Sequence, residues 1–158
     1  MTIPNFDAID TETYYDKECS VTTLGAHAYT RHPDFEVLCV SGAGRRGERS
    51  WVHRPENMPW DTLNKPIVAH NVAFDRAVLR SIPQFKDLPN SQWFDSAALC
   101  AYHQLPRDLK RASKEVLGIE HKKTVRTAMK GKRLADLDDE ELTAFWDYAK
   151  VDSELCAC

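Results

Sequence analysis

The sequence predicts an α/β fold in which strands come first and helices follow. Two observations indicate this class. Short apolar runs separated by turn-forming residues, typical of strands, lie between residues 8 and 71. After residue 72, apolar residues recur mainly at helical spacing. The 158 residues match the size of one ordinary domain, so we expect a single domain over residues 1–158.

Three strands are expected before residue 55. They are AIDTETYY at 8–15, FEVLCVSG at 35–42 and RSWVHR at 49–54. The glycine-rich segment GAGRRG joins the second run to the third, which predicts an antiparallel hairpin. The first strand is expected to lie beside this hairpin.

A strand that leads directly into a helix is expected next. KPIVAHN at 65–71 is a short apolar run, and VAFDRAVLRSI at 72–82 has helical spacing up to a proline. Another helix is expected to start near Asp95, which would cap it or lie close to a site without being a ligand. DLKRASKEVLG at 108–118 predicts a further helix with Gly118 as its C-terminal cap.

The last helix has the clearest start signals. Asp138 is a good N-cap, and Glu141 follows at the spacing of a capping box. Leu137 and Leu142 have the spacing of a hydrophobic staple. We expect a helix from about Asp139 almost to residue 158.

Composition excludes a membrane-spanning protein. The apolar share of 42% and the charged share of 28% are typical of soluble domains, and no apolar run is long enough to cross a bilayer. The N-terminal MTIPNFDAID lacks the basic start and apolar core of a signal peptide, so a cytoplasmic location is expected. The five cysteines include no CxxC pair, which favours reduced thiols.

Basic residues are concentrated in one segment, although the net charge of the chain is −3. HKKTVRTAMKGKR at 121–133 contains no acidic residue. Taken alone, the segment is either a solvated loop or a surface that contacts phosphate groups. Its basic residues are Lys122, Lys123, Arg126, Lys130, Lys132 and Arg133.

Two carboxylates lie one residue apart in the first expected strand. Side chains at positions i and i+2 point to the same face of a strand, so Asp10 and Glu12 would lie side by side. Repulsion disfavours the ionisation of both unless a cation or an ion pair compensates. A salt-bridged surface pair is the simpler interpretation of these two residues alone.

The last helix carries a carboxylate where a core residue is expected. Phe145, Tyr148, Asp152 and Leu155 form one stripe along that helix. Burying a carboxylate is unfavourable unless it is paired or binds a cation. For Asp152 considered alone, a hydrogen bond to Tyr148 at the edge of the helix face would compensate for this burial.

A further carboxylate, Asp75, falls in the first turn of the helix at 72–82, where aspartate also favours a helix start. Asp10, Glu12, Asp75 and Asp152 would repel one another strongly if the fold gathered them. A pair of divalent cations held by oxygen ligands would relieve this repulsion. Two-cation sites of this kind catalyse phosphoryl chemistry.

Three segments resemble the motifs of the DEDD 3′-5′ exonucleases, in the subclass with tyrosine in the third motif. They are IDTET with Asp10 and Glu12, HNVAFD ending in Asp75, and YAKVD from Tyr148 to Asp152. The chain between them is most similar to the proofreading domain of bacteriophage family A DNA polymerases. The resemblance implies a ribonuclease H-like fold, a mixed sheet with antiparallel first strands plus a parallel strand. It also implies removal of nucleotides from a DNA 3′ end.

The resemblance assigns roles to these residues. Asp10, Glu12, Asp75 and Asp152 would bind two divalent metal ions, Mg²⁺ or Mn²⁺, with Asp10 bridging both. Tyr148 would orient the attacking water together with Glu12. Because tyrosine is a weak base near neutral pH, we expect it to position the water and not to abstract a proton.

The resemblance also implies that Thr11, Asn71 and Phe74 lie near the 3′ end of single-stranded DNA. Thr11 points to the opposite face from its neighbours, so its contact would come through the backbone. Asn71 and Phe74 belong to the second motif, and Phe74 either stacks on a base or is a core residue of its helix. In the basic segment, Lys122, Lys123 and Arg126 would contact backbone phosphates.

Several alternatives stay open. The chain ends six residues after Asp152, whereas the phage polymerases continue into a polymerase domain. The chain is therefore either a self-standing exonuclease or a piece whose DNA polymerase partner is encoded separately, in the host cytoplasm if phage-encoded. The rival functions are a non-catalytic module that binds DNA ends or a polymerase, and an exoribonuclease that acts on short RNA.

Overall fold

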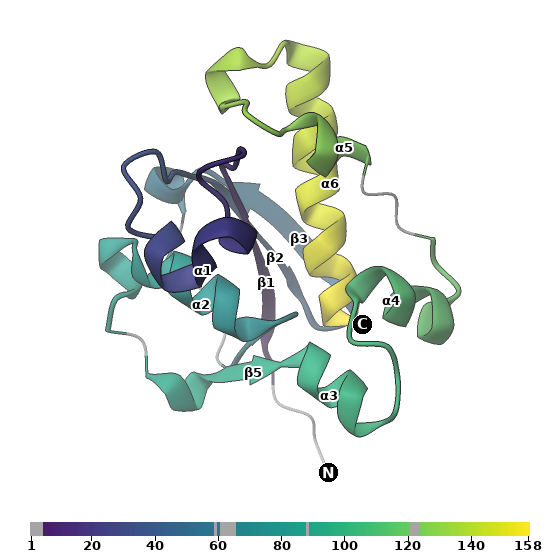
Figure 1. Cartoon of the computed structure of the whole chain (residues 1–158). Coiled ribbons are helices and arrows are strands. Elements are labelled where there is room, and N and C mark those ends of the chain that lie inside the picture. The colour runs from purple at the N-terminus through teal and green to yellow at the C-terminus, as the bar shows by residue number, and fades with distance from the viewer. Residues whose placement is uncertain (1–4, 59, 61–65, 88, 121–123) are drawn as a thin grey trace.

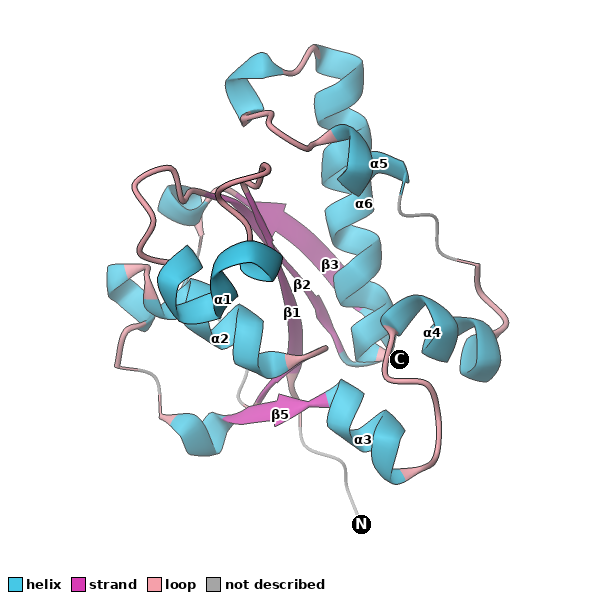
Figure 2. Cartoon of the chain, viewed as in Figure 1, coloured by secondary structure: helices cyan, strands magenta, loops and turns pink. Residues whose placement is uncertain are grey.

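A five-stranded sheet forms the centre of the molecule (Figures 1 and 2). The computed structural model describes residues 5–58, 60, 66–87, 89–120 and 124–158. The strand order is β3-β2-β1-β4-β5. The strands are β1 (Asp7–Thr13), β2 (Val37–Gly44), β3 (Glu48–His53), β4 (Ile67–Ala69) and β5 (Trp93–Asp95).

The strand directions confirm the expected α/β class with a mixed sheet. β1 pairs with β2, and β2 with β3, in antiparallel fashion, whereas β1–β4 and β4–β5 are parallel pairs. The topology is consistent with a ribonuclease H-like fold. The first strand ends at Thr13, two residues earlier than expected. The sequence does not predict β5, because its three residues WFD are too short to show alternation and directly precede a helix.

Helices cover both faces of the sheet. Figure 1 shows α1 and α2 on one side of β1 and α6 on the other. Ile9 and Val40 pack with Leu79 of α2, whereas Cys39 packs with Phe145 of α6. The helices are α1 (Val21–Tyr29), α2 (Val72–Arg80), α3 (Ser96–Tyr102), α4 (Leu109–Leu117), α5 (Thr124–Ala128) and α6 (Asp139–Ala157).

The capping signals in the sequence mark real helix ends. The Asp138 side chain accepts a 2.8 Å hydrogen bond from the Glu141 amide, and the Glu141 carboxylate accepts from the Asp138 amide. Gly118 ends α4 with a left-handed φ of 71°, which glycine adopts without steric cost. Asp95 accepts from the amides of Ala97 and Ala98 and caps α3, as expected.

Two helices go beyond those that the sequence predicts. α1 contains Gly25 at a φ of 74°, and this kink interrupts the helical pattern. α5 lies in the basic segment, where Val125 is the one partly buried apolar residue of the helix. Among the described residues, no helix has the length and apolar character needed to cross a membrane.

Candidate active site

β1 and α6 together bring three carboxylates to one place. Alternation along β1 directs Asp10 and Glu12 to the same face, and α6, which packs against β1, contributes Asp152. One carboxylate oxygen from each of the three residues lies within 4.8 Å of the others. Three side chains that the sequence separates by up to 142 positions therefore form one acidic group.

The fourth predicted carboxylate lies beside this group. Asp75 is buried in the first turn of α2, and its Oδ1 accepts hydrogen bonds from the Thr11 hydroxyl at 2.7 Å and the Thr11 amide at 3.2 Å. Thr11 thus points to the face opposite its two neighbours, as the strand spacing predicts. The predicted backbone contact of Thr11 with DNA stays a prediction, and in this structure its amide is bonded to Asp75.

The electrostatics of the group favour a bound cation. Burial raises the pKa of Asp10 well above its usual value, and the charges of Asp75, Asp152 and Glu12 raise it further. Burial also raises the pKa of Asp75 to about 7, although both hydrogen bonds from Thr11 act in the opposite direction. Carboxylates held at such proximity are the oxygen donors that hard divalent ions prefer, so this donor set fits magnesium or manganese.

Tyr148 lies one turn before Asp152 on α6 and is buried. Burial raises the pKa of its hydroxyl far above the usual value, and the nearby Glu12 and Asp152 raise it further. The hydroxyl therefore keeps its proton at neutral pH and acts as a hydrogen-bond donor, including to Asp152. This state suits the predicted role of orienting a water molecule better than that of a base.

The two residues predicted from the second motif lie next to Asp75. Asn71 is exposed, has a left-handed φ of 71°, and donates its amide to Asp95 at 3.1 Å. Phe74 is half-buried and stacks on Tyr29 with ring centroids 6.3 Å apart. One face of the Phe74 ring thus packs on Tyr29. The contacts of Asn71 and Phe74 with DNA stay predictions.

The basic segment is partly helical and partly engaged by the protein itself. Lys122 and Lys123 lie outside the described residues. Lys132 forms a 2.7 Å ion pair with Glu141, and Arg133 pairs with Glu36. Over residues 124–133, the described part of this segment, the chain is therefore not a fully solvated loop.

Arg126 of α5 differs from the other basic residues that the structure describes in this segment. Its charge interacts with Glu12 and Asp10, and it lowers the pKa of Asp10 against the effect of burial. Its carbonyl oxygen accepts a 2.5 Å hydrogen bond from the hydroxyl of Tyr15, 111 residues earlier in the chain. Sequence reasoning missed Tyr15, because no local pattern indicates a partner so distant.

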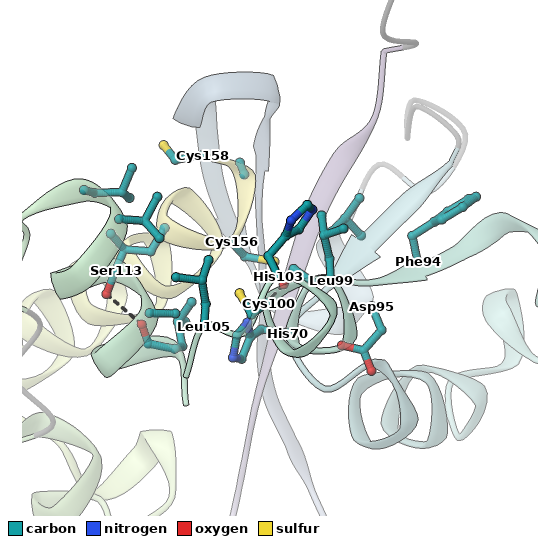
Figure 3. A pocket seen from close by; sticks show the side chains of 18 of the residues that line it. His70, Phe94, Asp95, Leu99, Cys100, His103, Leu105, Ser113, Cys156 and Cys158 are labelled. Atoms are coloured by element: carbon teal, nitrogen blue, oxygen red, sulfur yellow. Dashed lines mark hydrogen bonds between the residues drawn. The ribbon is translucent and has the colours of Figure 1, made fainter. Parts of the chain in front are cut away.

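A large cavity lies elsewhere and contains none of the predicted site residues. It has a volume of about 670 Å³ and a mostly apolar wall formed by α3, α4 and the end of α6 (Figure 3). In its wall, Ser96 Oγ lies 3.0 Å from His70 Nδ1 and 3.3 Å from Cys156 Sγ. Burial raises the pKa of the Cys156 thiol to about 12, which makes the thiol unreactive at neutral pH.

Comparison with known proteins identifies a shared fold. No family model matches the chain. No curated protein matches it either. A solved structure described as the apo form of the nuclease superposes with a TM-score of 0.63 at 21% sequence identity, over 96% of this chain and 67% of the other. The chain therefore has the fold of that nuclease over nearly its whole length.

Proposed function

We propose that this protein is a metal-dependent 3′-5′ exodeoxyribonuclease that releases nucleoside monophosphates from the 3′ end of single-stranded DNA. The observation that carries the proposal is the group formed by Asp10, Glu12 and Asp152, with Asp75 fixed beside it by Thr11. The nuclease that shares the fold supports it. We infer the 3′-5′ direction of degradation and the preference for DNA from the three motifs that resemble those of proofreading exonucleases.

In the proposed mechanism, Asp10, Glu12, Asp75 and Asp152 would hold two ions, Mg²⁺ or Mn²⁺. Bound ions of this kind make a water nucleophilic near neutral pH and stabilise charge on the leaving 3′ oxygen. Glu12 accepts a hydrogen bond from the attacking water. Tyr148 keeps its proton and directs the same water by hydrogen bonding. Thr11 fixes Asp75 through two hydrogen bonds to its Oδ1.

The surrounding residues bind the end of the strand. Asn71 and Phe74, next to Asp75 in sequence, contact the terminal nucleotide, with Phe74 offering its ring to the base. The basic segment attracts the DNA backbone towards an otherwise acidic site. Proofreading for a separately encoded DNA polymerase is the biological role that the resemblance to phage polymerases supports.

A 5′-labelled single-stranded DNA oligomer tests the activity. With Mg²⁺ or Mn²⁺ we expect stepwise shortening from the 3′ end, abolished by a chelator and by Asp10→Ala. Asp147→Asn is the matched control, because Asp147 is an exposed carboxylate of α6 that forms an ion pair with Lys150 one turn further along. Shortening that survives in Asp10→Ala, or its absence in the wild type with either metal, contradicts the proposal.

The same assay separates the rival functions. A matched RNA oligomer that is degraded faster than the DNA indicates an exoribonuclease. DNA binding that is independent of metal and unchanged by Asp75→Asn and Asp152→Asn, without degradation, indicates a non-catalytic module. We expect the DNA to be the better substrate and its degradation to require both carboxylates.

A further inference from the structure

The segment that contains α5 is tied to the chain after β1 by Tyr15, which lies two residues beyond the end of β1. The hydroxyl of Tyr15 donates a 2.5 Å hydrogen bond to the carbonyl oxygen of Arg126. The carbonyl oxygen of Tyr15 accepts a 2.8 Å hydrogen bond from the amide of Gly131. One residue of the chain that carries Asp10 and Glu12 thus binds both sides of the segment at 126–131.

Apolar packing fixes the orientation of this segment as well. Val125 and Met129 lie one helical turn apart and pack in the cluster that contains Phe145 and Ala149 of α6. Met129 is 5% exposed. One face of the segment packs on α6, and its backbone is hydrogen-bonded to Tyr15. Rotation of α5 about its axis would therefore break both sets of contacts.

Arg126 belongs to the segment that these contacts hold in place. Its guanidinium interacts with the charges of Glu12 and Asp10 and lies near Tyr148. A basic residue that only attracts the DNA backbone needs no such restraint. A cation held beside a metal-binding acidic group is placed where the phosphate that reacts must lie.

We propose that Arg126 contacts the scissile phosphate itself and that Tyr15 is the residue that positions it. This inference rests on the proposed function, because it names the part of the DNA that one residue of the same site binds. Negative charge on the phosphate oxygens is greatest in the transition state, where a preoriented guanidinium stabilises it most. Loss of Arg126 should therefore lower kcat more than it raises KM.

The first experiment is a kinetic double-mutant cycle with Arg126→Ala and Tyr15→Phe on the DNA oligomer. We expect Arg126→Ala to lower kcat by about 100-fold, the typical loss of one transition-state donor. Tyr15→Phe should lower kcat less and should have no further effect in the Arg126→Ala background. Controls are Arg111→Ala, on the exposed side of α4, and Tyr14→Phe, which removes a comparable hydroxyl bond to Asp16.

The second experiment does not depend on turnover. Thymidine 5′-monophosphate carries the phosphate that the reaction transfers, so we expect Arg126→Ala to weaken its binding about tenfold with Mg²⁺ present. Thymidine, which lacks the phosphate, should bind both proteins equally. Calorimetry measures both ligands, and thermal unfolding confirms that each variant is folded.

The outcomes separate this inference from the proposed function. A wild type that does not degrade DNA but binds the monophosphate through Arg126 overturns the nuclease and supports the phosphate contact. An active enzyme in which Arg126→Ala raises only KM, and monophosphate binding is unchanged, overturns the contact alone. Independent, additive effects of the two substitutions overturn the role of Tyr15.

Discussion

At the scale of single residues, the contact between Asp75 and Thr11 shows how burial and hydrogen bonding oppose each other. Two donors from one residue stabilise the ionised carboxylate, yet burial still raises its pKa to about 7. The carboxylate is therefore partly protonated in the metal-free protein near neutral pH. Protons and metal ions compete for it, so metal binding at this position depends on pH.

This competition predicts how the metal-free protein responds to pH. The pKa of Asp75 is higher in the folded than in the unfolded chain, where it is near 3.8, so the folded state binds the proton more tightly. The stabilising effect is complete below pH 4 and is lost as pH rises through 7, by at most about 1.4 kcal/mol per pH unit. Urea unfolding with chelator present should show wild-type stability falling from pH 5 to 8.

Asp75→Asn provides the comparison for that measurement. The amide oxygen that replaces the carboxylate oxygen would still accept both Thr11 donors, but the side chain does not titrate. We expect the stability of this variant to fall less steeply over the same pH range. Equal slopes for the wild type and the variant would show that Asp75 keeps an ordinary pKa.

Tyr148 leads to a second prediction at this scale. Tyr148→Phe removes the hydroxyl that positions the water but leaves the ring packed in α6 and all four carboxylates in place. We expect kcat to fall about 10- to 100-fold, at or below the lower end of the range for groups that transfer a proton, because Tyr148 only positions the water, with metal affinity unchanged. Single-turnover hydrolysis and calorimetry measure the two quantities. Tyr102→Phe, at an 82% exposed position, is the control.

At the scale of elements, local signals predict the helices whose pattern is uninterrupted, whether or not a side chain caps them: Asn71 makes no side-chain cap for the predicted α2, whereas Ser20 caps the unpredicted α1. α4 and α6 are predictable because Gly118 and the Asp138–Glu141 pair are local signals that the structure uses. α1 escapes prediction because Gly25 interrupts it, and α5 because its one partly buried apolar residue shows no periodicity. Their stability comes from tertiary contacts, which single-sequence patterns do not contain.

The cap of α6 provides a test at this scale. Asp138→Ala removes the side-chain acceptor of the Glu141 amide and half of the capping box. We expect a loss of about 1 kcal/mol in the free energy of unfolding. Asp139→Ala is the matched control, because it removes a first-turn charge and no cap, and should cost roughly 0.3 kcal/mol. Denaturant unfolding of both variants measures the difference, and equal losses would contradict a capping role.

At the scale of the whole molecule, the site exists only where three elements meet. Alternation along β1 predicts that Asp10 and Glu12 share a face, and helical spacing predicts Tyr148 beside Asp152. Neither spacing states that α6 packs against β1 or that α2 brings Asp75 to the other side of Thr11. Tertiary packing alone brings these side chains together, and it also brings Tyr15 to Arg126. The prediction that all four carboxylates belong to one site therefore depends on the resemblance of the three motifs to those of the DEDD exonucleases.

Because each element contributes a carboxylate, metal binding should stabilise the fold as a unit. A ligand that binds only the folded state adds about 2.7 kcal/mol at 100 times its dissociation constant. We expect Mn²⁺ to raise the unfolding temperature, and to raise it more at pH 8 than at pH 5.5, because the raised pKa values of Asp10 and Asp75 let protons displace metal at the lower pH. Asp152→Asn should abolish most of the shift, whereas Asp147→Asn should keep it. A shift that persists in Asp152→Asn would place the bound metal outside the group formed by β1 and α6.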